Sequence, residues 1–135
     1  MKRNNASIMQ LKETLTCIIF LLLVHSCKTT TQNNNAQIRF EKTEYNFGEL
    51  KQNSPAQTTF TFTNPGQTPL LILDVKTTCG CTVPKWPEKP VKPGKKGEII
   101  VTFDTSHPGV FSKTIFVSYN GKDSPVKLTI RGEVK

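Results

Sequence analysis

From residue 38 onward, apolar and polar residues alternate with a period of two, the pattern of half-buried β-strands. The clearest case is segment 58–63, in which Phe60 and Phe62 are predicted to face inward and every second residue, Thr59, Thr61 and Thr63, outward. Turn residues separate the strands, and Asn120-Gly121 in particular predicts a hairpin. No segment shows the 3.6-residue period of an amphipathic helix.

About seven short strands with frequent turns predict an all-β fold, an immunoglobulin-like antiparallel β-sandwich. The run Leu70–Val75 is nearly all apolar and is predicted to be a central strand. The proline-rich segment 84–94 is predicted to be an irregular crossing. The predicted core takes apolar residues from all the strands: Phe40, Phe47, Phe60, Phe62, Leu71, Leu73, Val101, Phe103, Ile115, Val117, Leu128 and Ile130.

Residues 1–27 have the pattern of a lipoprotein-type signal peptide. Basic residues precede a short apolar run, which ends at Val24-His25-Ser26-Cys27. The run is shorter than the roughly 20 residues that a membrane-spanning helix needs. Its end resembles a bacterial lipobox, which predicts that Cys27 becomes the lipidated N-terminus. The alternative is a plain secretory peptide cleaved nearby. In the lipoprotein interpretation, the protein is lipid-anchored in the cell envelope, most simply on the periplasmic face.

Residues 28–37 contain no apolar residue larger than alanine and predict a flexible tether, followed by a folded domain over residues 38–135. From residue 28 onward, 15 Lys and Arg against 9 Asp and Glu leave a net charge of +6. The lysines are scattered, except in segment 85–96, where five crowd together. A solvated surface explains this pattern better than nucleic-acid binding. An anionic glycan or lipid head group stays open as a ligand.

Cys79 and Cys81 are the only cysteines after Cys27 and are the main candidates for chemistry. Residues two apart in a strand point to the same face, so the two sulfurs would be neighbours. Gly80 is expected to supply the unusual backbone turn that brings them within disulfide distance. A ring this small is expected to be strained and therefore labile. The pair then has a static structural role, takes part in thiol redox chemistry, or binds a metal.

A metal site would combine Cys79 and Cys81 with His107, the only histidine after Cys27. Two thiolates favour a soft ion such as Cu(I) or Zn. In an immunoglobulin topology the loop that holds His107 lies at the same end as the cysteines, and Asp104 could add an oxygen ligand. His107 precedes Pro108-Gly109, however, and a lone histidine in that position is more often an ordinary turn residue than a ligand. No cofactor is predicted.

No catalytic residue is predicted. The serines have no histidine and acid beside them in a pattern that would define a triad. Asp74 and Asp104 are too far apart in sequence to argue for a carboxylate pair. The glycine-containing segment 92–97 lacks the strand-to-helix context of a phosphate-binding loop.

Several short motifs occur in an order that resembles the bacterial domain-of-unknown-function family 1573. They are Tyr45-Asn46-Phe47-Gly48, Phe60-Thr61-Phe62-Thr63-Asn64-Pro65-Gly66, Cys79-Gly80-Cys81-Thr82, Pro93-Gly94 and Gly109-Val110-Phe111-Ser112-Lys113. The resemblance covers nearly all of residues 38–135 and is most specific at Cys-Gly-Cys-Thr. It implies an immunoglobulin-like sandwich similar to Hydin-type modules, and export to a Gram-negative envelope, often with a lipid anchor. It implies no activity.

Together these observations predict an envelope lipoprotein that binds another envelope protein or component without catalysis, with the membrane reached through its lipid. The alternative is a thiol-redox or Cu/Zn-handling protein that uses the Cys79-Gly80-Cys81 pair.

Overall fold

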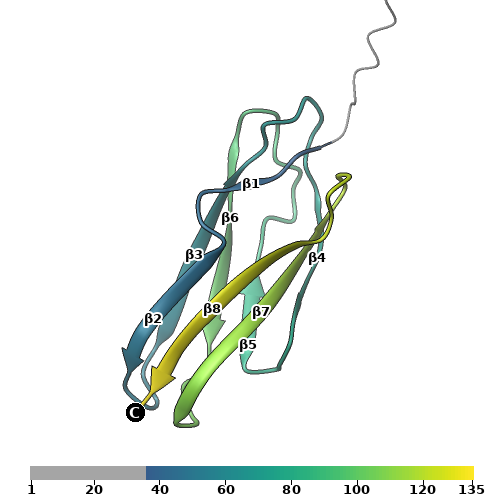
Figure 1. Ribbon diagram of the computed structural model, residues 1–135. Coiled ribbons are helices and arrows are strands. Elements are labelled where there is room, and N and C mark those ends of the chain that lie inside the picture. The colour runs from purple at the N-terminus through teal and green to yellow at the C-terminus, as the bar shows by residue number, and fades with distance from the viewer. Residues whose placement is uncertain (1–35) are drawn as a thin grey trace, which may run out of the picture. The chain divides into compact units, whose positions relative to one another are not determined.

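The computed structural model describes residues 36–135, and these residues contain eight strands and no helix (Figure 1). The strands are β1 Arg39–Phe40, β2 Glu44–Leu50, β3 Ala56–Thr63, β4 Ile72–Thr77, β5 Thr82–Lys85, β6 Lys96–Phe103, β7 Gly109–Tyr119 and β8 Val126–Val134. The predicted signal peptide, Cys27 and nearly all of the predicted tether lie outside the described residues. Within the described part, no helix is long and apolar enough to cross a membrane.

The strands form two four-stranded sheets packed face to face, one in the order β1-β3-β6-β5 and the other in the order β2-β8-β7-β4. Figure 1 shows β2, β8 and β7 in front of β3 and β6. The predicted immunoglobulin-like sandwich is confirmed. One pair differs from the prediction, because β2 runs parallel to β8. The chain passes from β1 to β2 through residues 41–43 alone, and so it changes sheet without reversing direction.

The core lies between the two sheets and is built by the inward residues of the alternating strands. Phe60, Phe62, Val101, Phe103, Ile115, Val117, Leu128 and Ile130 are buried as predicted, and Phe40 and Phe47 pack against them half-buried. Each fully buried side chain of this size contributes about 1.5–3 kcal/mol relative to exposure. Ala36, which falls in the predicted tether, is also buried, so the packed domain includes it.

The prediction that Leu71 and Leu73 belong to the core is wrong. Leu73 is 58% exposed and Leu71 is only half-buried, whereas Leu70, Ile72 and Val75 fill the core. The register of β4 against β7 shifts between Ile72 and Asp74, which marks a β-bulge at Leu73. Leu70 and Ile72 set the inward face, and because the bulge reverses the faces of the residues that follow, Val75 and not Asp74 continues it.

The prediction that Leu70–Val75 forms a central strand is also wrong, because β4 lies at the edge of its sheet and pairs only with β7. The predicted crossing begins instead with an edge strand, β5, in which Pro84 pairs with Val101. An edge strand accommodates proline because one of its sides has no ladder hydrogen bonds to lose. After β5 the crossing is irregular as predicted, apart from a bridge between Val91 and Leu70.

The hairpin predicted at Asn120-Gly121 is confirmed and joins β7 to β8. Its loop is longer than a two-residue turn and contains a cis peptide bond between Ser124 and Pro125. The Ser124 hydroxyl accepts a hydrogen bond from the Tyr119 amide at 2.9 Å. Gly121 is required by close packing, since a Cβ there would overlap the Tyr119 ring and the Ala36 carbonyl.

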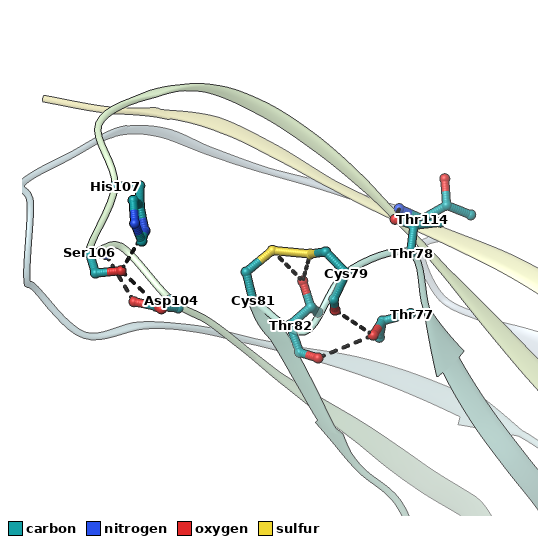
Figure 2. The surroundings of a disulfide bond; sticks show 9 residues. All are labelled: Thr77, Thr78, Cys79, Cys81, Thr82, Asp104, Ser106, His107 and Thr114. Carbon is teal, nitrogen blue, oxygen red and sulfur yellow. Dashed lines mark hydrogen bonds between the residues drawn. A yellow bond between two sulfur atoms is a disulfide. The ribbon is translucent and has the colours of Figure 1, made fainter.

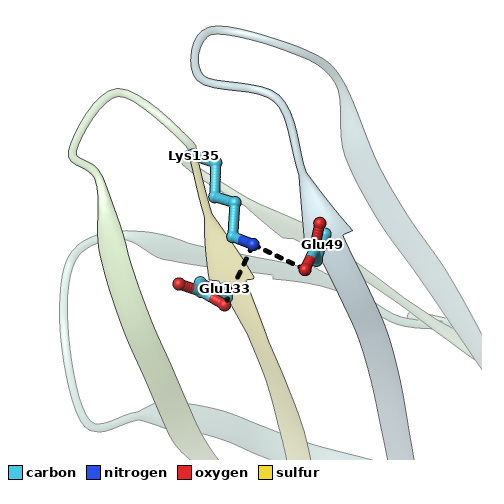
Figure 3. A network of polar contacts seen from close by, with 3 residues as sticks. All are labelled: Glu49, Glu133 and Lys135. Carbon is cyan, nitrogen blue, oxygen red and sulfur yellow. Dashed lines mark hydrogen bonds and ion pairs between the residues drawn. The ribbon is translucent and has the colours of Figure 1, made fainter.

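The parallel pair β2 and β8 is tied at its last residues by Lys135 (Figure 3). The Lys135 ammonium donates to the Glu49 carboxylate at 2.6 Å and lies 3.8 Å from that of Glu133. Its amide donates to the Leu50 carbonyl at 2.8 Å. Because the side chains are exposed, each ion pair contributes only about 0–1 kcal/mol, and the backbone bond fixes the strand end.

We expect Gly97→Ala to lower the free energy of unfolding by roughly 1–3 kcal/mol. The added Cβ would overlap the ring of Phe62, which is fully buried and has no free space to enter. Urea unfolding followed by circular dichroism measures the change. Gly80→Ala is the control, since no heavy atom lies within 4 Å of its added Cβ. Equal destabilisation by the two substitutions would contradict this packing.

Candidate functional site at the Cys79–Cys81 disulfide

The turn that carries the cysteines, residues 78–81, joins the edge strand β4 of one sheet to the edge strand β5 of the other. It is bonded to both sheets. The Thr78 amide donates to the Thr114 carbonyl of β7 at 3.2 Å, and the Cys81 carbonyl accepts from the Asp104 amide, just after β6, at 2.8 Å. The turn therefore has a defined position at one end of the sandwich, which we call the distal end.

Cys79 and Cys81 are joined in a disulfide, with their Cα atoms 5.3 Å apart (Figure 2). Both residues are half-buried. The Thr77 hydroxyl supports the turn from the end of β4, lying 2.9 Å from the Cys79 carbonyl and 3.3 Å from the Thr82 carbonyl. The two sulfurs thus lie on a bonded turn at the edge of the apolar core, against which Cys81 packs.

Gly80 differs from the expectation that it supplies an unusual backbone conformation. The glycines with positive φ among the described residues are Gly48, Gly94 and Gly109, and Gly80 is not one of them. Space does not demand a glycine either, because a Cβ at Gly80 would meet no heavy atom within 4 Å. The disulfide therefore closes without a left-handed residue between the cysteines.

Thr82, the first residue of β5, is buried at 3% exposure directly beneath the disulfide. Its hydroxyl oxygen lies 3.7 Å from the Cys79 sulfur and 4.0 Å from the Cys81 sulfur (Figure 2). A disulfide sulfur has no proton, so in this form the hydroxyl is the donor. A buried hydroxyl is thus directed at the one reactive bond of the domain.

Asp104, Ser106 and His107 lie in the loop between β6 and β7, close to the disulfide turn (Figure 2). The Ser106 hydroxyl donates to the Asp104 carboxylate at 3.0 Å and lies 2.8 Å from His107 Nδ1. The Ser106 amide also donates to Asp104. These two bonds, the amide first, hold the pKa of the exposed Asp104 carboxyl below its usual value. In a hydrolytic triad histidine separates acid and serine, whereas here serine separates acid and histidine.

A hollow of about 270 Å³ opens at the distal end, beside the disulfide. Its walls include Cys81, Phe103, Asp104, His107, Phe111 and Lys113. The floor is apolar, since Phe103 and Phe111 are buried, and a lysine, a histidine and a carboxylate border it. The structure thus brings Cys81, Asp104 and His107 together at one end, as the sequence predicted, and adds Lys113.

The soft-metal prediction for Cys79, Cys81 and His107 concerns the thiol form, because the two sulfurs here bond to each other. Within residues 36–135, no group of three or more histidine, cysteine or acidic side chains is placed to hold a metal ion. The metal site therefore stays a prediction from the sequence.

The fold and this site define a class: an immunoglobulin-like β-sandwich with a disulfide in the turn between its edge strands. A comparison with protein families matches residues 38–134 to "Protein of unknown function (DUF1573)". The chain belongs to the DUF1573 family. A comparison with curated proteins found no match.

Solved structures share the fold at low sequence identity. A protein of unknown function from Porphyromonas gingivalis W83 is 15% identical, with a TM-score of 0.67 over 80% of this chain. This chain spans about half of that protein, 51% of its length. The ASH/PapD-like domain 7 of human CEP192 is 10% identical, with a TM-score of 0.65 over 82% of this chain and 94% of that domain. The Vibrio cholerae protease VesB matches over 76% of this chain and 32% of its own, at 13% identity and a TM-score of 0.56. These likenesses establish the fold alone.

Sequence reasoning missed two residues of the site. Thr82 follows Cys81 directly and belongs to the most specific motif, so its position was the available signal. Lys113 had no such signal. It lines the hollow because β7 places it two residues from Phe111, on the same face of the strand.

We expect the double substitution Cys79→Ser and Cys81→Ser to leave the domain folded and to lower its free energy of unfolding by only about 1–2 kcal/mol. A disulfide stabilises mainly by closing a loop in the unfolded chain, and this loop contains only three residues. Urea unfolding of both proteins, without reductant, measures the difference. Failure of the double variant to fold would contradict the view that the core holds the domain without the disulfide.

Proposed function

We propose that the protein is a lipid-anchored module of the bacterial cell envelope, which binds another envelope component through its distal end without catalysis. Its acyl anchor would be Cys27, and the segment from residue 28 to the domain would be the tether. The immunoglobulin-like and PapD-like fold and the family description are consistent with a non-catalytic module.

The observation that carries this proposal concerns two places in the sandwich. The chain enters the domain near one end, and the disulfide turn lies toward the other. Ala36, where the described chain enters, packs beside Gly121 in the loop between β7 and β8. The disulfide turn lies toward the other end, where Thr77 pairs with Ile115 and the Thr78 amide bonds to Thr114 in the middle of β7. From Thr114 to Tyr119, the end of β7 beside Gly121, the five residues rise about 17 Å. An anchor before Ala36 would therefore hold the distal end away from the membrane.

The charge distribution supports the same orientation. Lys89, Lys92 and Lys95 are exposed in the segment between β5 and β6, at the end where Ala36 lies. None of the three forms an ion pair within residues 36–135. Unpaired lysines near a lipid anchor favour contact with an anionic membrane surface.

The distal end, in turn, has features of a contact surface. Val110 is 83% exposed beside the hollow, and Val83 on β5 is 56% exposed. The nearest arrangement to a catalytic one, Asp104 with Ser106 and His107, has its hydroxyl donating to the carboxylate, which does not activate it as a nucleophile.

We expect Cys27→Ala to move the protein from the membrane fraction to the soluble periplasmic fraction, because the acylated residue is lost. Fractionation of expressing cells and mass spectrometry of the N-terminal peptide provide the measurement. Cys17→Ala is the matched control, since it removes the other cysteine of the signal region and should leave the protein membrane-bound. The same distribution for both variants would contradict the lipid anchor at Cys27.

We expect a photoreactive residue at Val110 to give a discrete crosslinked species in cells, because the distal end is the proposed contact surface. Gel mobility and mass spectrometry of the purified species provide the measurement. The same residue at Lys122, at the opposite end, is the control and should not give that species. Identical products from both positions, or none from Val110, would contradict binding through the distal end.

A further inference from the structure

The two sulfurs of the disulfide differ in their surroundings, and the difference indicates a direction of attack. The Cys81 side chain lines the hollow, whereas Cys79 does not. The Thr82 hydroxyl is closer to the Cys79 sulfur than to the Cys81 sulfur, 3.7 Å against 4.0 Å. One sulfur is therefore reached from a hollow, and the other lies nearer a buried hydrogen-bond donor.

We propose that this disulfide exchanges with a pair of thiols on a partner protein, with Cys81 as the attacked sulfur, Cys79 as the leaving group and Thr82 as a positioning residue. The reaction adds to the proposed binding function and does not depend on the anchor at Cys27. It is stoichiometric: one disulfide of this protein oxidises one dithiol of the partner.

The first step forms one bond and breaks one bond. A thiolate of the partner, having released its proton to solvent, enters the hollow and bonds to the Cys81 sulfur. The bond between Cys81 and Cys79 breaks, and its electron pair leaves on Cys79 as a thiolate. That thiolate then takes a proton from water.

The second step transfers the disulfide to the partner. The partner's second thiolate attacks the partner's own sulfur in the mixed disulfide, and Cys81 leaves as a thiolate that is protonated by water. Two electrons pass from the partner's dithiol to Cys79 and Cys81. No further oxidant is needed, since the disulfide itself is reduced.

Thr82 favours this direction because its hydroxyl stabilises the leaving thiolate. A hydrogen bond to an ionised acceptor is about twice as strong as one between neutral groups. A better stabilised leaving thiolate departs faster in thiol–disulfide exchange. The buried position of Thr82, at 3% exposure, holds the hydroxyl in place before and after the bond breaks.

The charged groups at the hollow suit an incoming thiolate. The Lys113 ammonium lines it with Cys81, and the opposing carboxylate of Asp104 is engaged by the Ser106 amide and hydroxyl. The apolar floor of Phe103 and Phe111 accommodates the neighbouring side chains of a peptide that carries the thiol. The partner that fits is a cysteine-containing protein segment with a second thiol close by.

The first test maps the attacked sulfur in residues 36–135, which contain the whole described core and no other cysteine. The oxidised domain is mixed with reduced glutathione, quenched with acid, and digested for mass spectrometry. We expect most of the protein-bound glutathione on Cys81. Glutathione mainly on Cys79, or equally on both, would overturn the assignment of Cys81.

The second test measures the rate of reduction by dithiothreitol in Thr82→Val and Thr82→Ser. We expect a roughly tenfold loss of rate in Thr82→Val, corresponding to one lost hydrogen bond to a charged group. Thr82→Ser keeps the hydroxyl and should retain the wild-type rate. The pH midpoint of Cys79 alkylation in the reduced domain should rise in Thr82→Val alone. A purely structural role for Thr82 would not move that midpoint.

The control is Thr58→Val, a buried threonine on β3, which β6 separates from β5, and it should leave the rate unchanged. Circular dichroism before and after reduction verifies that every variant is folded. A wild-type rate in Thr82→Val would overturn the role of Thr82. A disulfide that is reduced only when the domain is unfolded in urea would overturn the exchange reaction as a whole.

Discussion

The distal end depends on one contact between the two sheets, the stacking of Phe103 on Phe111. Phe103 ends β6 in one sheet, and Phe111 lies near the start of β7 in the other, with ring centroids 3.8 Å apart and an interplanar angle of 19°. Gly132 makes room for this arrangement, because a Cβ there would overlap the Phe111 ring. Such a pair contributes about 0.5–1.5 kcal/mol beyond the area it buries.

The stack also positions the site. The residue after Phe103 is Asp104, whose amide holds the Cys81 carbonyl, and the second residue after Phe111 is Lys113 on the hollow wall. Two side chains that are remote in sequence are thus placed beside Cys81 by one aromatic contact. The geometry of the distal end therefore rests on core packing, and the disulfide is placed on a frame that the core sets.

The sequence predicted the fold where polar residues mark the phase of the alternation. In β3, Thr61 separates Phe60 from Phe62, and the inward face follows directly. In Leu70–Val75, neighbouring apolar residues leave the phase undetermined, and the bulge at Leu73 shifts it. The edge position of β4 and the strand containing Pro84 follow from which strands pair, which a local pattern does not contain.

The residues of the site also divide into those that the sequence predicted and those that only the structure revealed. The proximity of Cys79 and Cys81 follows from their spacing, and the approach of His107 follows from loops that share one end of the fold. The position of Lys113 on the wall of the hollow depends on the register of β7 and on the packing of Phe111. No sequence pattern therefore predicted it. Thr82 was visible as a neighbour of Cys81, but its burial and the direction of its hydroxyl required the structure.

Breaking the disulfide would leave the turn's other attachments in place. The Thr78 amide still bonds to β7, and the Cys81 carbonyl still bonds to the Asp104 amide, since neither bond involves sulfur. The three-residue loop that the disulfide closes constrains little of the unfolded chain. Oxidised and reduced domains should therefore share one backbone structure. A partner at this end would distinguish them by the chemistry of the two sulfurs and not by a change of shape.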